Sequence, residues 1–391
     1  MECTIGGTRR HLRDLSHGLN RAGVEVEVCC AALREPRMRD DMVALEAAGV
    51  RVHELPMVRA ITPARDARHA LALAQLVLDR GFDVIHTHSS KAGALGRLAG
   101  LAASGAARIH TPHTYAVAFE GGHGQGGEAA GPRSLILTTE RLLGRVTGRI
   151  IHVSEAELVQ GRELGIVRGR RGVVVPNGID PAPFAEPAGG AAVRAEFGIP
   201  AQAPVVGTVG LLNDAKGHDL LVDALGRLGP DVHLLLVGHG ERESRLRAQA
   251  EAAGLAERVH LAGWRDDVLA CYDAMDVFAL SSRWEGMAYA LLEAMASGRA
   301  CVSTDVNGSA EALAWKGPTE AESSEACGMI VPREDVGALA AALAELLADP
   351  GRRARFGASA RQRVARSFSV EAMVAATLAV YDDALGQPAP Q

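Results

Sequence analysis

The chain has 391 residues, of which 48% are apolar, 4% aromatic and 23% charged, and its formal net charge is −6. This length exceeds one ordinary core and fits two domains, while the apolar fraction excludes a disordered chain. No apolar stretch reaches the roughly 18 residues of a bilayer-spanning helix, and the start lacks the basic-then-apolar pattern of a secretory signal. Scarce aromatic residues and the lack of a basic cluster exclude nucleic acid as an expected partner.

The cysteines and the charge distribution add two expectations. Six cysteines are scattered without the spacing of a disulfide framework or a zinc site, so we expect a reduced, cytoplasmic compartment. The first 185 residues hold 23 Lys and Arg against 19 Asp and Glu, whereas the remainder has an acidic excess. A basic first half favours an anionic membrane surface or a phosphorylated acceptor. A chance fluctuation of solvated charge explains the difference equally well.

In the first half, strand-like and helical runs alternate, which is typical of a parallel sheet covered by helices on both faces. Only five residues precede Gly6 and Gly7. These are too few for the buried strand that usually opens such a sheet, so we expect the natural start codon to lie upstream. We assign residues 1–185 to this first domain. Strands are expected at 24–30, 50–54, 82–88, 108–111, 149–153 and 172–175, and helices at 9–22, 64–80, 91–104, 132–146 and 155–164.

The second half repeats the alternation. A turn at 175–180 and a stretch rich in Pro, Ala and Gly at 181–192 predict a linker ahead of it. The second domain is expected at 200–368, and residues 369–391 form a last helix and a tail. Strands are expected at 204–209, 232–237, 258–262, 276–280 and 300–304, and helices at 217–228, 241–253, 268–274, 287–297, 334–348, 352–367 and 370–385.

Two glutamates in this half, Glu285 and Glu293, have seven residues between them. The first follows a predicted strand and the second lies two turns into a helix, so both would face one wall of a cleft. Gly286 permits close approach of a ligand, and the amides of Met287 and Ala288 are expected to form the helix start, where phosphate oxygens bind readily. A carboxylate for hydroxyl groups beside amides for phosphate suits a nucleotide sugar. Two unrelated acids on a solvated helix are the alternative for any pair at this spacing.

The string from Ser282 to Gly298 resembles the signature of the family 4 retaining glycosyltransferases (glycosyl transferases group 1), and motifs along nearly the whole chain match in the same order. The resemblance implies the GT-B fold, in which two doubly wound, Rossmann-like domains face each other across a cleft and the C-terminal helix crosses back to the N-terminal domain. It implies transfer of a sugar from a nucleotide-diphosphate sugar to an acceptor hydroxyl, with retention. Neither a metal nor a cofactor other than the donor is expected.

The resemblance also implies a setting for the reaction. Relatives assemble cell-surface polysaccharides or glycolipids, so we expect a sugar, lipid-linked or small-molecule acceptor and peripheral contact with the inner membrane face. Within the second domain, Glu285 would hold hydroxyls of the transferred sugar and Glu293 would hold the ribose. Trp264 or Arg265 would offer a flat face to the nucleobase. Plain packing between a strand and a helix is the alternative for Trp264.

The first domain contributes a glycine turn and a histidine to this picture. Gly6 and Gly7 open a helix, and the family loop at that place lies at the donor phosphates, although such a pair alone is usually just a turn. His113 follows a strand and matches the residue that lines the donor sugar, where a neutral imidazole can orient a hydroxyl. His110 lies three residues earlier, but no carboxylate or cysteine cluster supports a metal. The run 86–91 is a weaker candidate for the acceptor side.

Lys216 belongs to the second strong match and is one of three lysines in the chain. The family pattern places an arginine right after the second glycine and a lysine five residues later, and together they neutralise the leaving diphosphate. At the arginine position stands Leu211, which removes a bidentate phosphate donor and argues against full activity. Arg9, Arg10 and Arg283 are candidates to replace it.

Two other functions remain open from the sequence. A catalytically weak or inactive sugar-nucleotide-binding protein is suggested by Leu211 and the short start. A nucleotide-sugar epimerase of similar architecture would isomerise its substrate without an acceptor. The Glu285 string favours the transferase.

Overall fold

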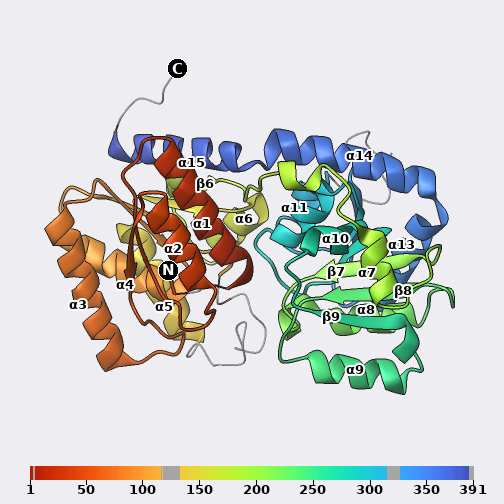
Figure 1. The fold of residues 1–391 in the computed structure, drawn as a ribbon. Helices are drawn as coiled ribbons and strands as arrows, with labels where there is room; N and C mark the ends of the chain where they lie inside the picture. The colour runs from red at the N-terminus through yellow and green to blue at the C-terminus, as the bar shows by residue number, and fades with distance from the viewer. Residues whose placement is uncertain (3–4, 116, 118–132, 315–325, 387–391) are drawn as a thin grey trace. The chain divides into compact units, whose positions relative to one another are not determined.

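The fold is described here from a computed structural model, in which residues 1–2, 5–115, 117, 133–314 and 326–386 are placed. The chain divides into two compact units (Figure 1). We call residues 1–178 together with the segment from 370 onward the N-terminal unit, and residues 179–369 the C-terminal unit. Both units consist of parallel strands and intervening helices, as the alternating pattern predicts.

The strands described in the N-terminal unit form two parallel sheets. One pairs β1 with β2, and the other has the order β3-β4-β5-β6. Ile109 and Ile150, on the central strands β4 and β5, are fully buried because helices cover both faces. All six strands fall within three residues of their predicted ranges. They are β1 (Glu27–Cys30), β2 (Arg51–Glu54), β3 (Val84–His88), β4 (Ala107–Thr111), β5 (Arg149–His152) and β6 (Gly172–Val174).

The first two residues connect β1 to the segment that follows β3. The ammonium group of Met1 donates to the carbonyl of Cys29 at 2.6 Å, and the amide of Ala31 donates to the carbonyl of Met1 at 3.0 Å. The carboxylate of Glu2 accepts hydrogen bonds from the hydroxyl of Ser89 and the amide of Ala92. Met1 and Glu2 therefore lie between the edge of one sheet and the end of the other.

The last helix of the chain, α15 (Val370–Leu385), belongs to the N-terminal unit and packs on α1 (Gly6–Arg21). Gly18 permits this approach, since a Cβ there would collide with Val374. The crossing-back helix of the GT-B fold is thus present. The other helices of the unit are α2 (Met38–Ala47), which the sequence reading missed, α3 (Pro63–Arg80), α4 (Ser90–Ala99), α5 (Arg133–Val146) and α6 (Glu155–Glu163).

The C-terminal unit contains one parallel sheet with the order β12-β11-β10-β7-β8-β9. Strand β7 lies between β8 and β10. From β7 the strand order continues through β8 and β9 toward one edge of the sheet and through β10, β11 and β12 toward the other, so the loops after β7 and β10 are neighbours. Ligands of open α/β sheets bind at such a switch point. The strands are β7 (Val205–Val209), β8 (His233–Val237), β9 (Val259–Gly263), β10 (Val277–Leu280), β11 (Ala300–Thr304) and β12 (Gly328–Val331), of which β12 was not predicted.

The boundary between the units lies at 178/179, earlier than the sequence suggested. The amide of Ile179 donates to the carbonyl of Phe368, and Gly190 packs against the backbone of Asp273 and Ala274. Much of the Pro- and Gly-rich stretch is therefore docked on the C-terminal unit. The helices of this unit are α7 (Gly190–Glu196), α8 (His218–Leu225), α9 (Glu243–Ala252), α10 (Val268–Asp273), α11 (Tyr289–Ala296), α12 (Ser309–Leu313), α13 (Val336–Ala348) and α14 (Pro350–Ser367).

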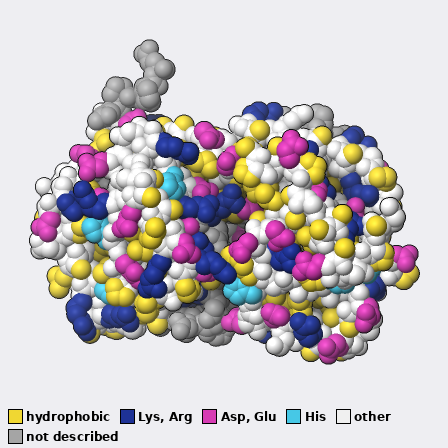
Figure 2. Space-filling view, in the orientation of Figure 1, with side chains coloured by type: hydrophobic (Ala, Val, Ile, Leu, Met, Phe, Trp, Pro, Cys, Tyr) yellow, Lys and Arg dark blue, Asp and Glu magenta, His cyan; other side chains and the backbone are white. Residues whose placement is uncertain are grey.

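Charged side chains of both signs are intermingled on each unit, on the face drawn in Figure 2. The difference in net charge between the two halves therefore does not produce a surface of one sign on that face. Among the helices of the described residues, none has both the length and the apolar character needed to span a bilayer.

Candidate functional site

The carboxyl ends of β7 and β10 are joined by hydrogen bonds at the switch point of the C-terminal sheet. After β7 the chain forms a short 3-10 helix (Asp214–Lys216). The hydroxyl of Ser281 donates to the carbonyl of Lys216 at 2.9 Å, and the amide of Arg283 donates to the carbonyl of Ala215 at 2.8 Å. Gly217 has a φ of +58°, and a Cβ there would collide with the carbonyl oxygen of Ser281. Glycine is thus required for this approach.

Lys216 and Glu285, predicted from separate motifs, form an ion pair at this point. The Lys216 Nζ lies 2.5 Å from Glu285 Oε1, and the hydroxyl of Ser282 donates to the same oxygen at 2.8 Å. The two side chains are 16% and 11% exposed, so water screens their charges only partly. An incoming phosphate could take the ammonium group, and a polyol could donate its hydroxyls to the carboxylate.

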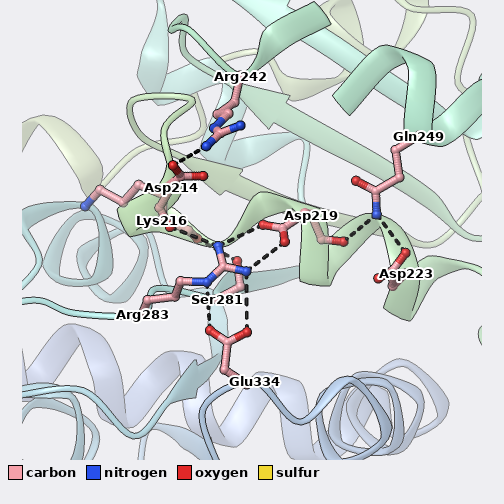
Figure 3. A network of polar contacts seen from close by, with 9 residues as sticks. All are labelled: Asp214, Lys216, Asp219, Asp223, Arg242, Gln249, Ser281, Arg283 and Glu334. Atoms are coloured by element: carbon pink, nitrogen blue, oxygen red, sulfur yellow. Dashed lines mark hydrogen bonds and ion pairs between the residues drawn. The ribbon is translucent and has the colours of Figure 1, made fainter. Parts of the chain in front are cut away.

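Arg283, one candidate replacement for the missing arginine, is engaged by carboxylates (Figure 3). Its guanidinium donates to both oxygens of Asp219, at 3.0 and 2.7 Å, and pairs with Glu334 at 2.7 Å. The hydrogen bonds that Arg283 donates to Asp219 are the main reason that the pKa of Arg283 is raised. Arg9 and Arg10, the other two candidates, pair with Asp41 and Asp14 in the N-terminal unit. Each of the three therefore already neutralises a carboxylate.

Arg242, which the sequence reading missed, lies beside the loop that carries Leu211. The amide of Arg242 donates to the carbonyl of Leu212 at 2.9 Å, and its guanidinium bonds the carboxylate of Asp214 (Figure 3). That bond raises the pKa of Arg242. The glycines at 238 and 240 allow the loops after β7 and β8 to touch, since a Cβ at either would collide with the backbone of residues 210–212. The loop after β8 thus places a guanidinium near position 211, where it pairs with Asp214 of the loop after β7.

The second glutamate of the pair, Glu293, lies on α11 and has a partner of its own. The hydroxyl of Tyr272 donates to Glu293 Oε2 at 2.6 Å. Helix α11 begins at Tyr289, two residues later than predicted, so Ala288 is its N-cap and Met287 precedes it. This is a correction to the predicted helix start. A Cβ at Gly308 would lie 2.7 Å from the carbonyl oxygen of Gly286, so the loop after β11 closes over that glycine.

Trp264 and Arg265, the predicted contacts for the nucleobase, face different surroundings. Trp264 is 44% exposed, and its ring meets that of His239 edge-on at 5.5 Å. The guanidinium of Arg265 pairs with Glu196 and Asp267 at 2.6 and 2.7 Å. The exposure of the indole argues against a role of Trp264 in packing alone. Because the guanidinium of Arg265 is paired with carboxylates, Trp264 is the better candidate to stack on a nucleobase.

In the N-terminal unit, Gly6 and Gly7 form the first turn of α1, as predicted for a glycine turn that opens a helix. Gly6 has a φ of +57°, and nothing would lie within 4 Å of a Cβ there. This open backbone is compatible with a ligand that approaches closely. The left-handed φ favours glycine at position 6, whereas the packing of the described residues leaves room for a Cβ there.

His113 lies within a group of histidines at the carboxyl ends of β3 and β4. Its Nε2 is 3.1 Å from Nδ1 of His88, and its ring meets the ring of His11 edge-on at 4.4 Å. His86 lies next to them, where its two nitrogens bond the hydroxyls of Tyr381 and Thr111, both at 2.8 Å. Sequence reasoning considered 86–91 and His113 separately, and it did not consider His11.

Burial keeps these imidazoles neutral. It lowers the pKa of His11 to about 4 and that of His86 to about 3. It also lowers the pKa of His88 and of His113 well below the usual value, and the neighbouring histidines add a smaller repulsion in the same direction. At neutral pH the group therefore offers uncharged donors and acceptors.

The backbone around His113 is held in an uncommon conformation. His113 and Thr114 have φ values of +58° and +111°, which L-residues rarely adopt. The fully buried carboxylate of Glu157 accepts the amides of Thr114 and Val153 at 2.6 and 2.8 Å. Strain that the surrounding structure fixes in this way is typical of functional sites.

Each half of the chain matches a known protein family. The family described as "Glycosyl transferases group 1" matches residues 191–363, and the "Glycosyl transferase 4-like domain" matches residues 6–178. A D-inositol 3-phosphate glycosyltransferase of Kineococcus radiotolerans is 31% identical, over 96% of this chain and 90% of its own length.

Two further similarities are to a relative whose name contains a diphosphoundecaprenol-linked sugar and to a structure solved in complex with UDP-glucose. The relative is the Escherichia coli UDP-Gal:alpha-D-GlcNAc-diphosphoundecaprenol alpha-1,3-galactosyltransferase. It is 31% identical to this chain, and the matched region covers 64% of this chain and 65% of the relative. The structure of Anabaena Alr3699/HepE in complex with UDP-glucose has a TM-score of 0.75 at 21% identity, with 96% of each chain covered. At that identity the likeness concerns the fold.

Proposed function

The chain belongs to the group 1 glycosyltransferases of GT-B fold, and we propose that it moves a sugar from a nucleotide-diphosphate sugar to an acceptor hydroxyl with retention at the anomeric carbon. The observation that carries the proposal is the contact of Lys216 with Glu285 at the switch point of the C-terminal sheet. Cleavage of a glycosyl phosphate leaves a diphosphate, so a cation beside a hydroxyl-binding carboxylate meets both demands of the reaction.

The donor would occupy the carboxyl ends of β7 and β10. Its diphosphate would displace Glu285 from the ammonium of Lys216, and Glu285 would then accept hydroxyls of the transferred sugar. Backbone amides at the start of α11 would add further donors for phosphate. Glu293 would bind the ribose, and the exposed face of Trp264 would stack on the base. With these groups present, no metal is needed to neutralise the diphosphate.

The N-terminal unit would contribute His113 as a neutral partner for a sugar hydroxyl, and Gly6 and Gly7 as open backbone for phosphate. The buried carboxylate of Glu157 accepts backbone amides with both oxygens and is therefore a poor nucleophile. We accordingly favour attack of the acceptor on the same face from which the diphosphate leaves, without a covalent sugar-enzyme intermediate.

The acceptor is proposed to be lipid-linked or a small molecule, in cell-surface polysaccharide or glycolipid synthesis on the inner side of the membrane. The E. coli relative, whose name specifies a diphosphoundecaprenol-linked sugar as substrate, supports this class. The D-inositol 3-phosphate glycosyltransferase supports the small-molecule alternative.

A transfer assay with the full chain tests the proposal. A panel of UDP- and GDP-sugars is offered with undecaprenyl-diphosphate sugars and with inositol phosphate, and products are detected by mass and their anomeric configuration by NMR. We expect one donor to give a product with the donor's anomeric configuration. Inversion would exclude retention, and isomerised donor without acceptor would indicate an epimerase.

The second candidate, a sugar-nucleotide-binding protein of little activity, is favoured by Leu211 at the position of the family's arginine. It predicts that UDP or GDP binds the full chain while neither transfer nor donor hydrolysis occurs with any member of the panel. Tight nucleotide binding accompanied by steady turnover would exclude it.

A further inference from the structure

Three histidines from separate segments of the N-terminal unit meet at one point. His11 comes from α1, His88 from the end of β3, and His113 from the loop after β4. One ligand nitrogen of each lies within 4.8 Å of those of the other two. His11 and His88 are buried, and His113 is partly exposed.

The spacing is close to what a tetrahedral ion requires. Zinc binds imidazole nitrogens at about 2.0–2.1 Å, which places two ligands of a tetrahedron about 3.3 Å apart. His88 Nδ1 and His113 Nε2 are already 3.1 Å apart. The ligand nitrogen of His11 lies within 4.8 Å of both, so it would have to approach them by at most about 1.5 Å.

The surrounding groups orient the rings. His11 Nδ1 lies 3.1 Å from the amide oxygen of Asn177, an acceptor, so Nδ1 carries the proton and Nε2 carries the lone pair. A second hydrogen bond of this kind commonly fixes a metal-binding imidazole. The left-handed backbone conformation of His113 positions its ring, and Glu157 stabilises that conformation by accepting a hydrogen bond from the amide of Thr114.

The neighbouring His86 differs from these three. Both of its nitrogens already bond hydroxyl groups, of Tyr381 and Thr111, so it supports the group without offering a ligand atom. A stacked pair in the C-terminal unit, His233 and His260, has its nitrogens 2.9 Å apart. That pair shows that two adjacent histidines can serve as packing, so the third ring is what distinguishes the group in the N-terminal unit.

We propose that His11, His88 and His113 form a binding site for a transition-metal dication of the zinc class, with water in the fourth position. Imidazole nitrogen suits Zn²⁺, Cu²⁺, Ni²⁺ and Co²⁺ and disfavours Mg²⁺ and Ca²⁺, which prefer oxygen. Three imidazoles leave one coordination position open to a small ligand.

A consequence for transfer rests on the proposed function. An ion at this site takes the ring nitrogen of His113 that the proposed function assigns to a hydroxyl of the donor sugar. Zn²⁺ should therefore inhibit transfer, while Mg²⁺ should leave it unchanged. If Zn²⁺ binds and transfer is unaffected, the metal site stands and the assignment of His113 to the donor sugar fails.

Cobalt titration of the full, tag-free and chelator-treated chain tests the site directly. We expect one Co²⁺ per chain, visible absorption bands of tetrahedral cobalt, and their loss when Zn²⁺ but not Mg²⁺ is added. His88→Gln and His11→Gln should each weaken binding by about 100-fold or more, since each removes one of three ligands. His260→Gln should retain binding within a few-fold.

Two results would overturn the proposal. One is the lack of saturable Co²⁺ uptake by the folded wild-type chain. The other is unchanged uptake in His88→Gln with an unaltered circular dichroism spectrum. Should both ligand variants fail to fold, X-ray absorption at the zinc edge of the wild-type complex decides: three imidazoles support the site, and one or none contradicts it.

Discussion

At the carboxyl ends of its strands, the C-terminal unit carries ammonium, guanidinium and carboxylate groups, whereas the N-terminal unit carries neutral imidazoles. Lys216, Glu285 and Arg242 represent the first kind of chemistry. His11, His88 and His113 represent the second, and burial keeps them uncharged. Two units of similar architecture thus provide different electrostatics. Charge suits a diphosphate, and neutral hydrogen-bonding groups suit sugar hydroxyls.

The largest expected effect comes from removing the charge of the C-terminal site. Glu285→Gln and Lys216→Met should each lower kcat/KM for transfer by about 10²–10³-fold, because each removes an interaction with the reacting donor. Steady-state kinetics and a thermal melt separate this effect from instability. Arg194→Met is the matched control, since Arg194 is a similarly buried cation (15% exposed) that pairs with Asp276 at 2.9 Å. Wild-type turnover in either site variant would refute the assignment.

Arg242 provides a sharper test of how charge is supplied without an arginine at position 211. Arg242→Ala should lower kcat/KM by about 10–100-fold, if its guanidinium meets the diphosphate. Arg247→Ala is the control, since Arg247 lies on α9, of which Arg242 is the N-cap, and its 58% exposed side chain pairs with Glu243. Leu211→Arg in the Arg242→Ala background should restore part of the loss. Equal activity of the two alanine variants would show that Arg242 is not involved.

Lowering the pH should destabilise the folded chain, because the buried histidines of the N-terminal unit are held neutral. The pKa of His11 is lowered to about 4 in the folded chain, so the unfolded chain binds more protons below pH 6.5. The free energy of unfolding therefore falls as pH drops from about 6.5 toward 4, by up to about 1.4 kcal/mol per pH unit for this proton. Urea unfolding at pH 7, 6 and 5 measures the slope. His11→Asn should reduce it, and an unchanged slope would contradict the buried, neutral state.

The smallest effect is expected at the nucleobase. Trp264→Ala should weaken binding of UDP or GDP by about 10-fold, which corresponds to stacking of one base on an exposed indole. Calorimetric titration of the nucleotide measures it, and Trp264→Phe should keep most of the affinity. An equal loss in the variants of Trp264 and Arg265 would instead indicate that the whole turn had moved.

Much of the fold was predictable from local pattern. Runs such as 234–237 and 277–280 are apolar throughout, because a parallel strand covered by helices on both faces is buried on both. Shorter elements were missed. Strand β12 and helix α2 have weak patterns, and α7 was hidden in a stretch whose Pro and Gly content indicated a linker, although its glycine serves close packing on Asp273.

The candidate site was predicted in part for the same reason. Glu285 and Lys216 stand in strings long enough to be specific, and the strands that precede them ended where predicted. Arg242 had no such signal, because its relation to position 211 depends on the pairing of β7 with β8. His11 likewise looked like one residue of an amphipathic helix, since nothing in its neighbourhood along the chain marks it as a partner of His113.

The sequence by itself determined the family, the order of strands and helices, and the identity of the charged groups that follow β7 and β10, because these are encoded within short segments. Only the tertiary structure decided which of those groups are adjacent. The ion pair of Lys216 with Glu285 and the meeting of three imidazoles both depend on which strands are neighbours in a sheet. Strand order is set by the packing of the whole unit, and no single segment contains that information.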